Sequence, residues 1–195
     1  MNERTFRVSE AQKLEDPERL KWLPPAEILD RLKLKPSTTV ADVGAGTGYF
    51  TIPLAEFLGP TGTVYAVDLQ RGMLDILTGK LSRQTTPLNV VVKHGTASRT
   101  GLPEESCDLV FMANLWHELD NHAAVLQETS RILRPAGRLA FLDWRHDLLP
   151  PPGPPAHHRL AMNGVVSVLR QNGWNDQHAA HVALYSYMIV SSFSG

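Results

Sequence analysis

The chain has 195 residues, of which 43% are apolar and 20% are charged, and its formal net charge is −1. This length fits one domain with short additions at its ends, and the composition is typical of a globular protein. The balanced charge offers no bulk attraction to nucleic acid or to a membrane surface, so we expect neither as a partner. The lone cysteine, Cys107, excludes an internal disulfide and a multi-cysteine zinc site, and it fits a reducing, cytoplasmic location.

Apolar residues recur with helical and strand spacings that alternate along the chain. An amphipathic stretch over 24–34, with prolines at its start, predicts a helix. Asp120 or Asn121 is expected to cap a helix that ends before residue 135. In chain order, the pattern predicts strands over 39–43, 63–69, 89–93, 108–113 and 138–144, with helices over 49–58 and 71–83 and room for another between the third and fourth strands.

The composition changes in the last quarter of the chain. The run PPPGPP over 150–155 indicates a loop, because proline and glycine interrupt regular elements. A helix near 158–171 and strands over 175–183 and 186–193 are expected to follow. Apolar strands that alternate with helices predict an α/β fold: a Rossmann-like doubly wound sheet, mostly parallel, with helices on both faces and an antiparallel C-terminal hairpin.

Residues 40–50 read VADVGAGTGYF and place several glycines between a strand and a helix. Glycine is costly inside either element, so these glycines are expected to let a ligand approach the backbone. Ligands of open α/β sheets bind at the carboxyl ends of the strands, and a helix N-terminus there attracts an anion. The second strand ends in Asp68, where a carboxylate commonly holds ribose hydroxyls. The ligand is therefore expected to contain a ribose and an anionic group.

The spacing D-x-G-x-G-x-G, from Asp42 to Gly48, differs from the G-x-G-x-x-G of nicotinamide-binding sites. It resembles the first motif of the class I S-adenosylmethionine-dependent methyltransferases. Four later segments resemble that family's further motifs in the same order: VYAVDLQRGML, HGTAS, CDLVFMANLWHEL and RILRPAGRLAFLDW. The branch that the chain resembles includes ubiquinone/menaquinone and arsenite methyltransferases. A single cysteine does not suit arsenite chemistry, and the longer N-terminal signature of the quinone enzymes is not found.

This resemblance implies a site for S-adenosylmethionine and its product, S-adenosylhomocysteine. Asp42 is expected to hold the amino group, unless it is a buried carboxylate that caps the loop. Asp68 is expected to bind the ribose, unless it caps the next helix. Leu69 and Met73 would enclose the adenine, although Met73 also fits a core position. The implied cofactor-binding residues are Asp42, Gly44, Ala45, Gly46, Gly48, Asp68, Leu69, Met73, Thr96, Ala97, Asn114 and Leu115.

The resemblance also implies methyl transfer by SN2 displacement to a small-molecule acceptor. A protonated nucleophile would need a general base, and His117 and Glu118 follow the fourth strand where the methyl group is expected. His117 also fits a role in shaping the pocket. No metal is expected, and Cys107 is expected to be half-buried. Further candidate bases are His146, His157 and His158, and candidate pocket walls are Trp116 and Tyr187.

Several questions stay open from the sequence alone. The chain could be a binding module for the cofactor rather than an enzyme, or it could methylate a macromolecule. Residues 1–23 precede the predicted domain over 24–195, and the stretch 4–22 mixes arginines with apolar residues. In similar enzymes this region folds over the cofactor, so we expect either a lid or a helix docked on the surface. The acceptor and the oligomeric state do not follow from the sequence.

Overall fold

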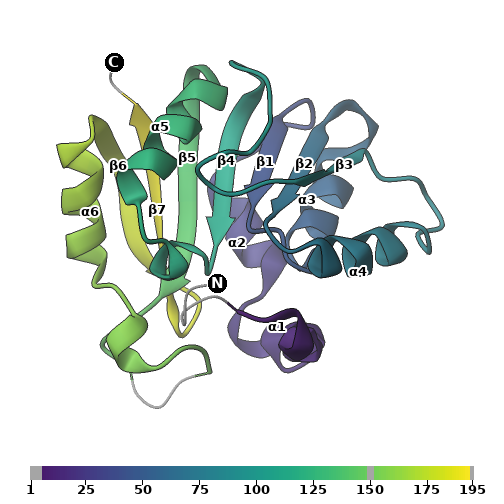
Figure 1. The fold of residues 1–195 in the computed structure, drawn as a ribbon, viewed down its shortest axis with the longest axis horizontal. Coiled ribbons are helices and arrows are strands. Elements are labelled where there is room, and N and C mark those ends of the chain that lie inside the picture. The colour runs from purple at the N-terminus through teal and green to yellow at the C-terminus, as the bar shows by residue number, and fades with distance from the viewer. Residues whose placement is uncertain (1–5, 149–151, 194–195) are drawn as a thin grey trace.

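The computed structural model describes residues 6–148 and 152–193, and its strands form one seven-stranded sheet (Figure 1). The strand order is β3-β2-β1-β4-β5-β7-β6. The first five strands pair in parallel, and β7 lies antiparallel between β5 and β6. The expected Rossmann-like sheet with an antiparallel C-terminal hairpin is therefore confirmed. The strands are β1 (Thr39–Val43), β2 (Thr63–Asp68), β3 (Val90–His94), β4 (Cys107–Ala113), β5 (Leu133–Trp144), β6 (Trp174–Val182) and β7 (Ser186–Phe193).

Helices cover both faces of this sheet because its strands are apolar on both sides. On one face, Leu54 packs in a cluster with Val40, and Leu77 packs with Ala66. The other face carries the largest cluster, which includes Phe141 from the middle of β5. The first face is covered by α2 (Pro25–Leu32), α3 (Thr51–Leu58) and α4 (Arg71–Leu81), and the second by α5 (His122–Ile132) and α6 (Met162–Gln171).

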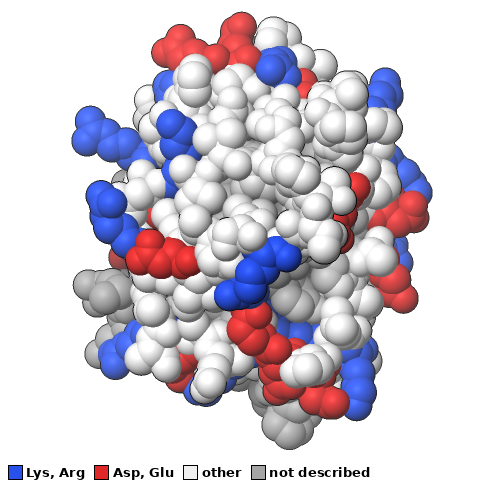
Figure 2. All heavy atoms as spheres, turned by 90° about the vertical axis from the view of Figure 1, so that its right-hand side faces the viewer, with Lys and Arg blue, Asp and Glu red and all other residues white. Residues whose placement is uncertain are grey.

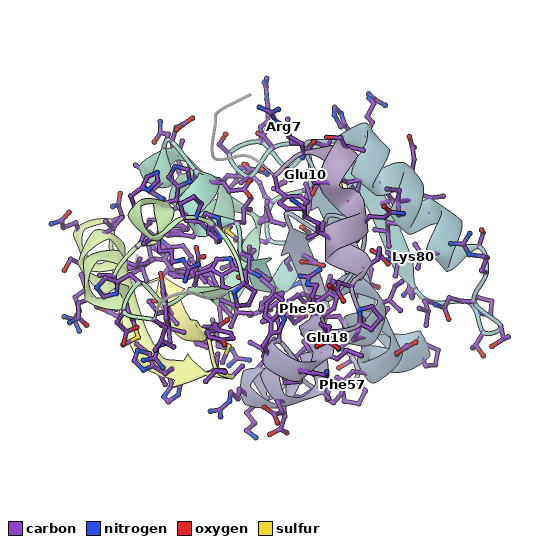
Figure 3. The ribbon with its side chains drawn as sticks, turned by 90° about the horizontal axis from the view of Figure 1, so that it is seen from below. Arg7, Glu10, Glu18, Phe50, Phe57 and Lys80 are labelled. Atoms are coloured by element: carbon purple, nitrogen blue, oxygen red, sulfur yellow. The ribbon has the colours of Figure 1, made fainter. Side chains whose placement is uncertain are left out.

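The N-terminal segment, η1 (Val8–Glu15) and α1 (Arg19–Trp22), lies across the carboxyl ends of the parallel strands. In Figure 1 it is the purple chain at the bottom, below the arrowhead of β4. Figure 3 looks onto this end and shows the segment running from Arg7 and Glu10 toward Glu18. The same edge of the sheet is where an open α/β fold binds its ligand.

Several predicted boundaries need correction. A further helix was allowed for between the third and fourth strands, but the described structure has a loop there. This loop contains an isolated bridge between Thr96 and Arg99. The fifth strand begins at Leu133 rather than at 138, because a register shift against β4 absorbs the turn at Ala136, whose φ is +64°. The sixth helix begins at Met162 after a separate short turn of 3-10 helix. Cys107 was expected to be half-buried, but it is fully buried at the start of β4.

The side of the molecule that ends at β3 carries both kinds of charge. In Figure 2, lysines and arginines are interspersed with acidic side chains, and neither sign forms a continuous stripe on this face. Within the described residues, no helix has the length and apolar character needed to cross a membrane.

Gly48 is placed for packing. Its φ of +89° lies in the left-handed region, and a Cβ on it would overlap Cδ1 of Leu77 on α4. The third glycine of the loop thus allows α4 to pack closely against the start of α3.

We expect Gly48→Ala to lower the free energy of unfolding by about 1–3 kcal/mol, because the new methyl group meets both backbone strain and overlap. Urea denaturation measures this change. The control is Gly79→Ala inside α4, where a Cβ would meet no atom within 4 Å. That variant should be more stable than the wild type by about 0.5–1 kcal/mol. Equal urea midpoints for Gly48→Ala and the wild type would contradict the packing role.

Candidate functional site

A cavity of about 1030 Å³ opens at the carboxyl ends of the central strands, beneath the N-terminal segment. It brings together residues that are far apart in the sequence. Gly48 is not among its lining residues. The sequence-predicted site residues that line it are Asp42, Gly44, Ala45, Gly46, Asp68, Leu69, Met73, Thr96, Ala97, Asn114, Leu115, His117 and Glu118.

The glycine loop is fixed against the end of β2 by its own backbone. The N–H groups of Gly44 and Ala45 both donate to the carbonyl of Val67, over 2.8 and 3.1 Å. The N–H of Gly46 donates to Oδ2 of Asp68 over 2.8 Å. Gly44 and Gly46 have φ of +81° and +54°, which glycine adopts without strain. The loop thereby leaves its inner surface open to the cavity.

Two buried carboxylates lie beside this loop. Burial is the main cause that raises the pKa of Asp42 to about 7, the charge of Asp68 adds to the rise, and a 2.6 Å hydrogen bond from Thr51 opposes it. Burial also raises the pKa of Asp68, although the N–H groups of Gln70 and Gly46 donate to its two oxygens. A cationic ligand would favour the ionised form of both groups.

Asn114 offers an unsatisfied acceptor at the end of β4. Its backbone has a φ of +54°, and its N–H donates to the carbonyl of Leu142 over 2.7 Å. Its side-chain Oδ1 is buried and has no hydrogen-bond partner among residues 6–148 and 152–193. Buried polar atoms are rarely left unpaired, so this oxygen fits an N–H donor on a ligand.

His117 is held by a carboxylate that the sequence interpretation did not single out. Its Nδ1 lies 2.7 Å from Oδ1 of Asp143, and its backbone N–H donates to Oδ2 of the same residue over 2.9 Å. Burial alone would lower the pKa of His117, but the charge and hydrogen bond of Asp143 outweigh it and raise the pKa. Asp143 is fully buried at the end of β5. Asp143 could have been found in the sequence, because it is an acidic residue near the end of an apolar strand, at the edge of the sheet where ligands bind.

Glu118 also lines the cavity and interacts electrostatically with His117. Burial raises the pKa of its carboxyl to about 7, while His117 and a hydrogen bond from the N–H of Phe6 oppose the rise. The Phe6 contact connects the N-terminal segment directly to the loop after β4. The segment is also tied to the glycine loop, because Thr47 donates to Glu15 over 2.5 Å.

One wall of the cavity is aromatic, but its residues are not Trp116 and Tyr187, which the sequence interpretation expected there. The rings of Trp22 and Trp144 lie 5.2 Å apart, and those of Tyr49 and Phe50 also lie 5.2 Å apart. The four residues come from three separate segments, because Tyr49 and Phe50 are adjacent, so no local pattern could assign all of them to one wall.

A loop over residues 152–155 completes this wall beside Trp144. It is held by the buried Arg159, which donates to the carbonyl oxygens of Pro154, Arg145 and Leu148. A Cβ on Gly153 would lie 2.8 Å from the ring of Trp144, so the backbone itself contacts the indole.

Other expected wall residues and bases lie outside the cavity lining. Trp116 was expected at the wall, but it is buried and stacks on Phe141 at 4.9 Å. Tyr187 is buried in β7, opposite Asp143 in the β5–β7 register. The candidate bases that do not line the cavity are His146, His157 and His158. Within the part of the chain that the structure describes, no three potential metal ligands come together.

Comparison with known proteins agrees with this geometry. Residues 41–141 match the family model described as "Methyltransferase domain". A solved S-adenosylmethionine-dependent methyltransferase from Aquifex aeolicus is 30% identical, with a TM-score of 0.90 over 96% of this chain and 98% of that one. An arsenic(III) methyltransferase from Chlamydomonas reinhardtii shares the fold, at 23% identity and a TM-score of 0.64, over 80% of this chain and 62% of that one.

A curated relative is the demethylmenaquinone methyltransferase of Geobacillus sp. strain WCH70, which is 30% identical over 64% of this chain and 52% of its own length. The chain therefore spans about half the length of the curated relatives that it matches.

The chain belongs to the methyltransferase-domain family. It is a class I S-adenosylmethionine-dependent methyltransferase, and S-adenosylmethionine is its cofactor. This membership agrees with the spacing of the glycine loop, which differs from that of nicotinamide-binding sites. The residues present fit the cofactor, because the cavity offers buried carboxylates for a cation and the unpaired Oδ1 of Asn114 for a donor.

We expect Asp68→Ala to weaken S-adenosylhomocysteine binding by about 2–3 kcal/mol, because charge-assisted hydrogen bonds to a ribose would be lost. Calorimetry measures the affinity. Asp75→Ala, on an exposed position of α4, serves as the matched control and should bind like the wild type. If Asp68→Ala also binds like the wild type, the ribose assignment is wrong.

Proposed function

We propose that this protein transfers the methyl group of S-adenosylmethionine to a small-molecule acceptor held against the aromatic wall. The observation that carries the proposal is that one cavity contains both the glycine loop and that wall, with the N-terminal segment above them. A volume of about 1030 Å³ is at the upper end for small-molecule sites and leaves room for two ligands. The name of the curated relatives also gives a small molecule, demethylmenaquinone, as their acceptor.

In this proposal the glycine loop and three polar side chains hold the cofactor. Asp68 would accept hydrogen bonds from the ribose hydroxyls, and Asp42 and Asn114 would receive the ammonium group. Leu69 and Met73, with Thr96 and Ala97 across from them, would border the adenine. When bound, the cofactor supplies a methyl group on a positively charged sulfur, which is already activated for transfer.

The aromatic wall would orient the acceptor and exclude water. Trp22 and Trp144 offer flat apolar faces, and aromatic side chains bind planar ligands through large contact areas. Holding the acceptor in line with the methyl group removes the entropy cost of bringing two molecules together.

His117 would act as the general base for an acceptor that arrives protonated. Asp143 holds Nδ1, and the second ring nitrogen, Nε2, would take the proton from a hydroxyl, thiol or ammonium group of the acceptor. Asp143 is a positioning residue, because it fixes the ring and stabilises the imidazolium that forms. Since the pKa of His117 is raised, its base form becomes available at a higher pH than that of an ordinary histidine.

We further propose that residues 1–23 form a lid over a methyltransferase domain that comprises residues 24–195. The support is a set of contacts made by the described part of the segment. The N–H of Phe6 donates to Glu118, the N–H of Val8 donates to Oε1 of Gln70 over 3.3 Å, and Glu15 forms an ion pair with Lys80 on α4. Figure 3 shows Lys80 on the α4 side of this segment. Arg4, which belongs to the same proposed lid, lies outside the described residues.

The proposal predicts release of S-adenosylhomocysteine in the presence of a small acceptor. A panel of phenols, thiols, amines and carboxylic acids should contain at least one that the wild type methylates. With that acceptor, His117→Asn should lower kcat by about 10²–10⁴-fold and leave the affinity for S-adenosylhomocysteine unchanged. The pH profile should lose its acid limb in this variant.

Asp143→Asn separates the positioning role from the catalytic one. It should keep an acid limb but move it to lower pH, because the charge of Asp143, which contributes most to raising the pKa of His117, is removed. An acid limb that persists in His117→Asn would overturn the assignment of the base. Turnover of protein or nucleic acid substrates, with none in the small-molecule panel, would overturn the proposed acceptor class.

The lid predicts slower hydrogen exchange in η1 when S-adenosylhomocysteine is bound. Amides of residues 8–15 should gain protection, because the ligand would fill the space below them. Amides of α6, on the far face of the sheet, should be unaffected and serve as the control. Equal exchange in η1 with and without the ligand would indicate a docked surface helix instead.

A further inference from the structure

Arg19 is a buried cation in the wall of the cavity. It begins α1 and lines the cavity together with Trp22 and Tyr49, and only 7% of its surface is exposed. Burying an arginine is costly, and burial lowers the pKa of this guanidinium. A cation in this position needs partners that replace the water it has lost.

The described contacts of Arg19 leave most of its hydrogen-bonding capacity unused. Nη1 donates to the carbonyl of Leu14 over 2.6 Å. The guanidinium carbon lies 3.9 Å from the centroid of the Tyr49 ring and 5.9 Å from that of Trp22. A guanidinium carries N–H donors on all three of its nitrogens. Among the described residues no carboxylate forms an ion pair with it.

Unlike Arg19, the lysines in and beside the N-terminal segment form ion pairs with carboxylates. Lys13 pairs with Glu10, and Lys21 pairs with Glu18. Two carboxylates, Glu15 and Asp16, raise the pKa of Arg19 through their charges. Glu15 is paired with Lys80 on α4. The other, Asp16, accepts a hydrogen bond from the backbone N–H of Glu18.

The guanidinium of Arg19 lies over the face of the Tyr49 ring, and this contact restricts its orientation. A guanidinium held in one plane presents parallel N–H groups that match the two oxygens of a carboxylate, which a lysine cannot do. The aromatic wall beside it accepts a flat ring. Together these features describe a site for an aromatic ring that carries a carboxylate.

We propose that Arg19 binds the carboxylate of the methyl acceptor, so that the acceptor is an aromatic acid whose ring lies against the wall formed with Trp22 and Tyr49. This inference rests on the proposed function, which it narrows to one class of acceptor. Arg19 is then a residue for acceptor specificity, separate from the cofactor-binding loop and from His117.

The test compares two probes that differ in charge. Protein saturated with S-adenosylhomocysteine is titrated with benzoate and with benzyl alcohol, and binding is followed by calorimetry. We expect benzoate to bind about 10-fold more tightly, as one charge-assisted hydrogen-bonded pair would provide. Equal binding of the two probes by the wild type would overturn the proposal without any variant.

Three variants test whether Arg19 causes the preference for benzoate. Arg19→Gln should lose the preference for benzoate, and Arg19→Lys, which keeps the charge but not the planar fork, should retain only part of it. Lys21→Gln, on the same short helix and outside the cavity lining, should keep the full preference. A preference that survives in Arg19→Gln would overturn the assignment. Binding of S-adenosylhomocysteine by each variant reports that it is folded.

A turnover assay distinguishes failure of this inference from failure of the proposed function. The turnover assay compares 3,4-dihydroxybenzoate with catechol, which lacks the carboxylate. A lower KM for the acid that disappears in Arg19→Gln, with kcat changed less, supports the inference. If benzoate binds through Arg19 but no small molecule is ever methylated, the site recognises an acid while the proposed methyl acceptor class is wrong.

Discussion

The hydrogen bond from the N–H of Gly46 to Asp68 joins the two parts of the chain on which the rest of the site depends. It connects the loop after β1 to the last residue of β2, over 2.8 Å. Since the same carboxylate also accepts from Gln70 at the start of α4, one buried side chain orients the glycine loop, the strand end and the helix. These hydrogen bonds hold the glycine loop along one side of the cavity, so they contribute to the shape of the cavity.

This junction also sets the electrostatic character of the cavity. Asp42, Asp68 and Glu118 all face it, and burial raises the pKa of each. In a region of low dielectric, carboxyl groups this close oppose one another's ionisation, and a cation relieves the conflict. In the proposed function, the positively charged cofactor would relieve this conflict when it binds. His117 and Asp143 form a separate pair, whose opposite charges stabilise each other.

The sequence predicted the features that arise from local spacing. Strands with apolar runs, the glycine loop and Asp68 all follow from residues that are neighbours in the chain, and the sheet has the expected order of elements. The strand boundaries near Ala136 were missed because the bulge depends on the register with β4. Trp116 was assigned to the wall because it follows a strand end, yet tertiary packing turns it onto Phe141. Arg19 and Asp143 became visible only when the fold brought distant segments together.

The anchoring of the loop beside Trp144 has a consequence for how such an enzyme changes over evolutionary time. Arg159 holds that loop through backbone carbonyl oxygens, which every residue type possesses. Side chains in the loop can therefore be exchanged without loss of the anchor, as long as position 153 remains small enough to lie on the indole ring. Substitutions in this loop can therefore reshape one wall of the proposed acceptor site while the sheet and the glycine loop stay as they are. If acceptors bind there, a few substitutions in one short stretch of chain would admit new acceptors to the same methyltransferase.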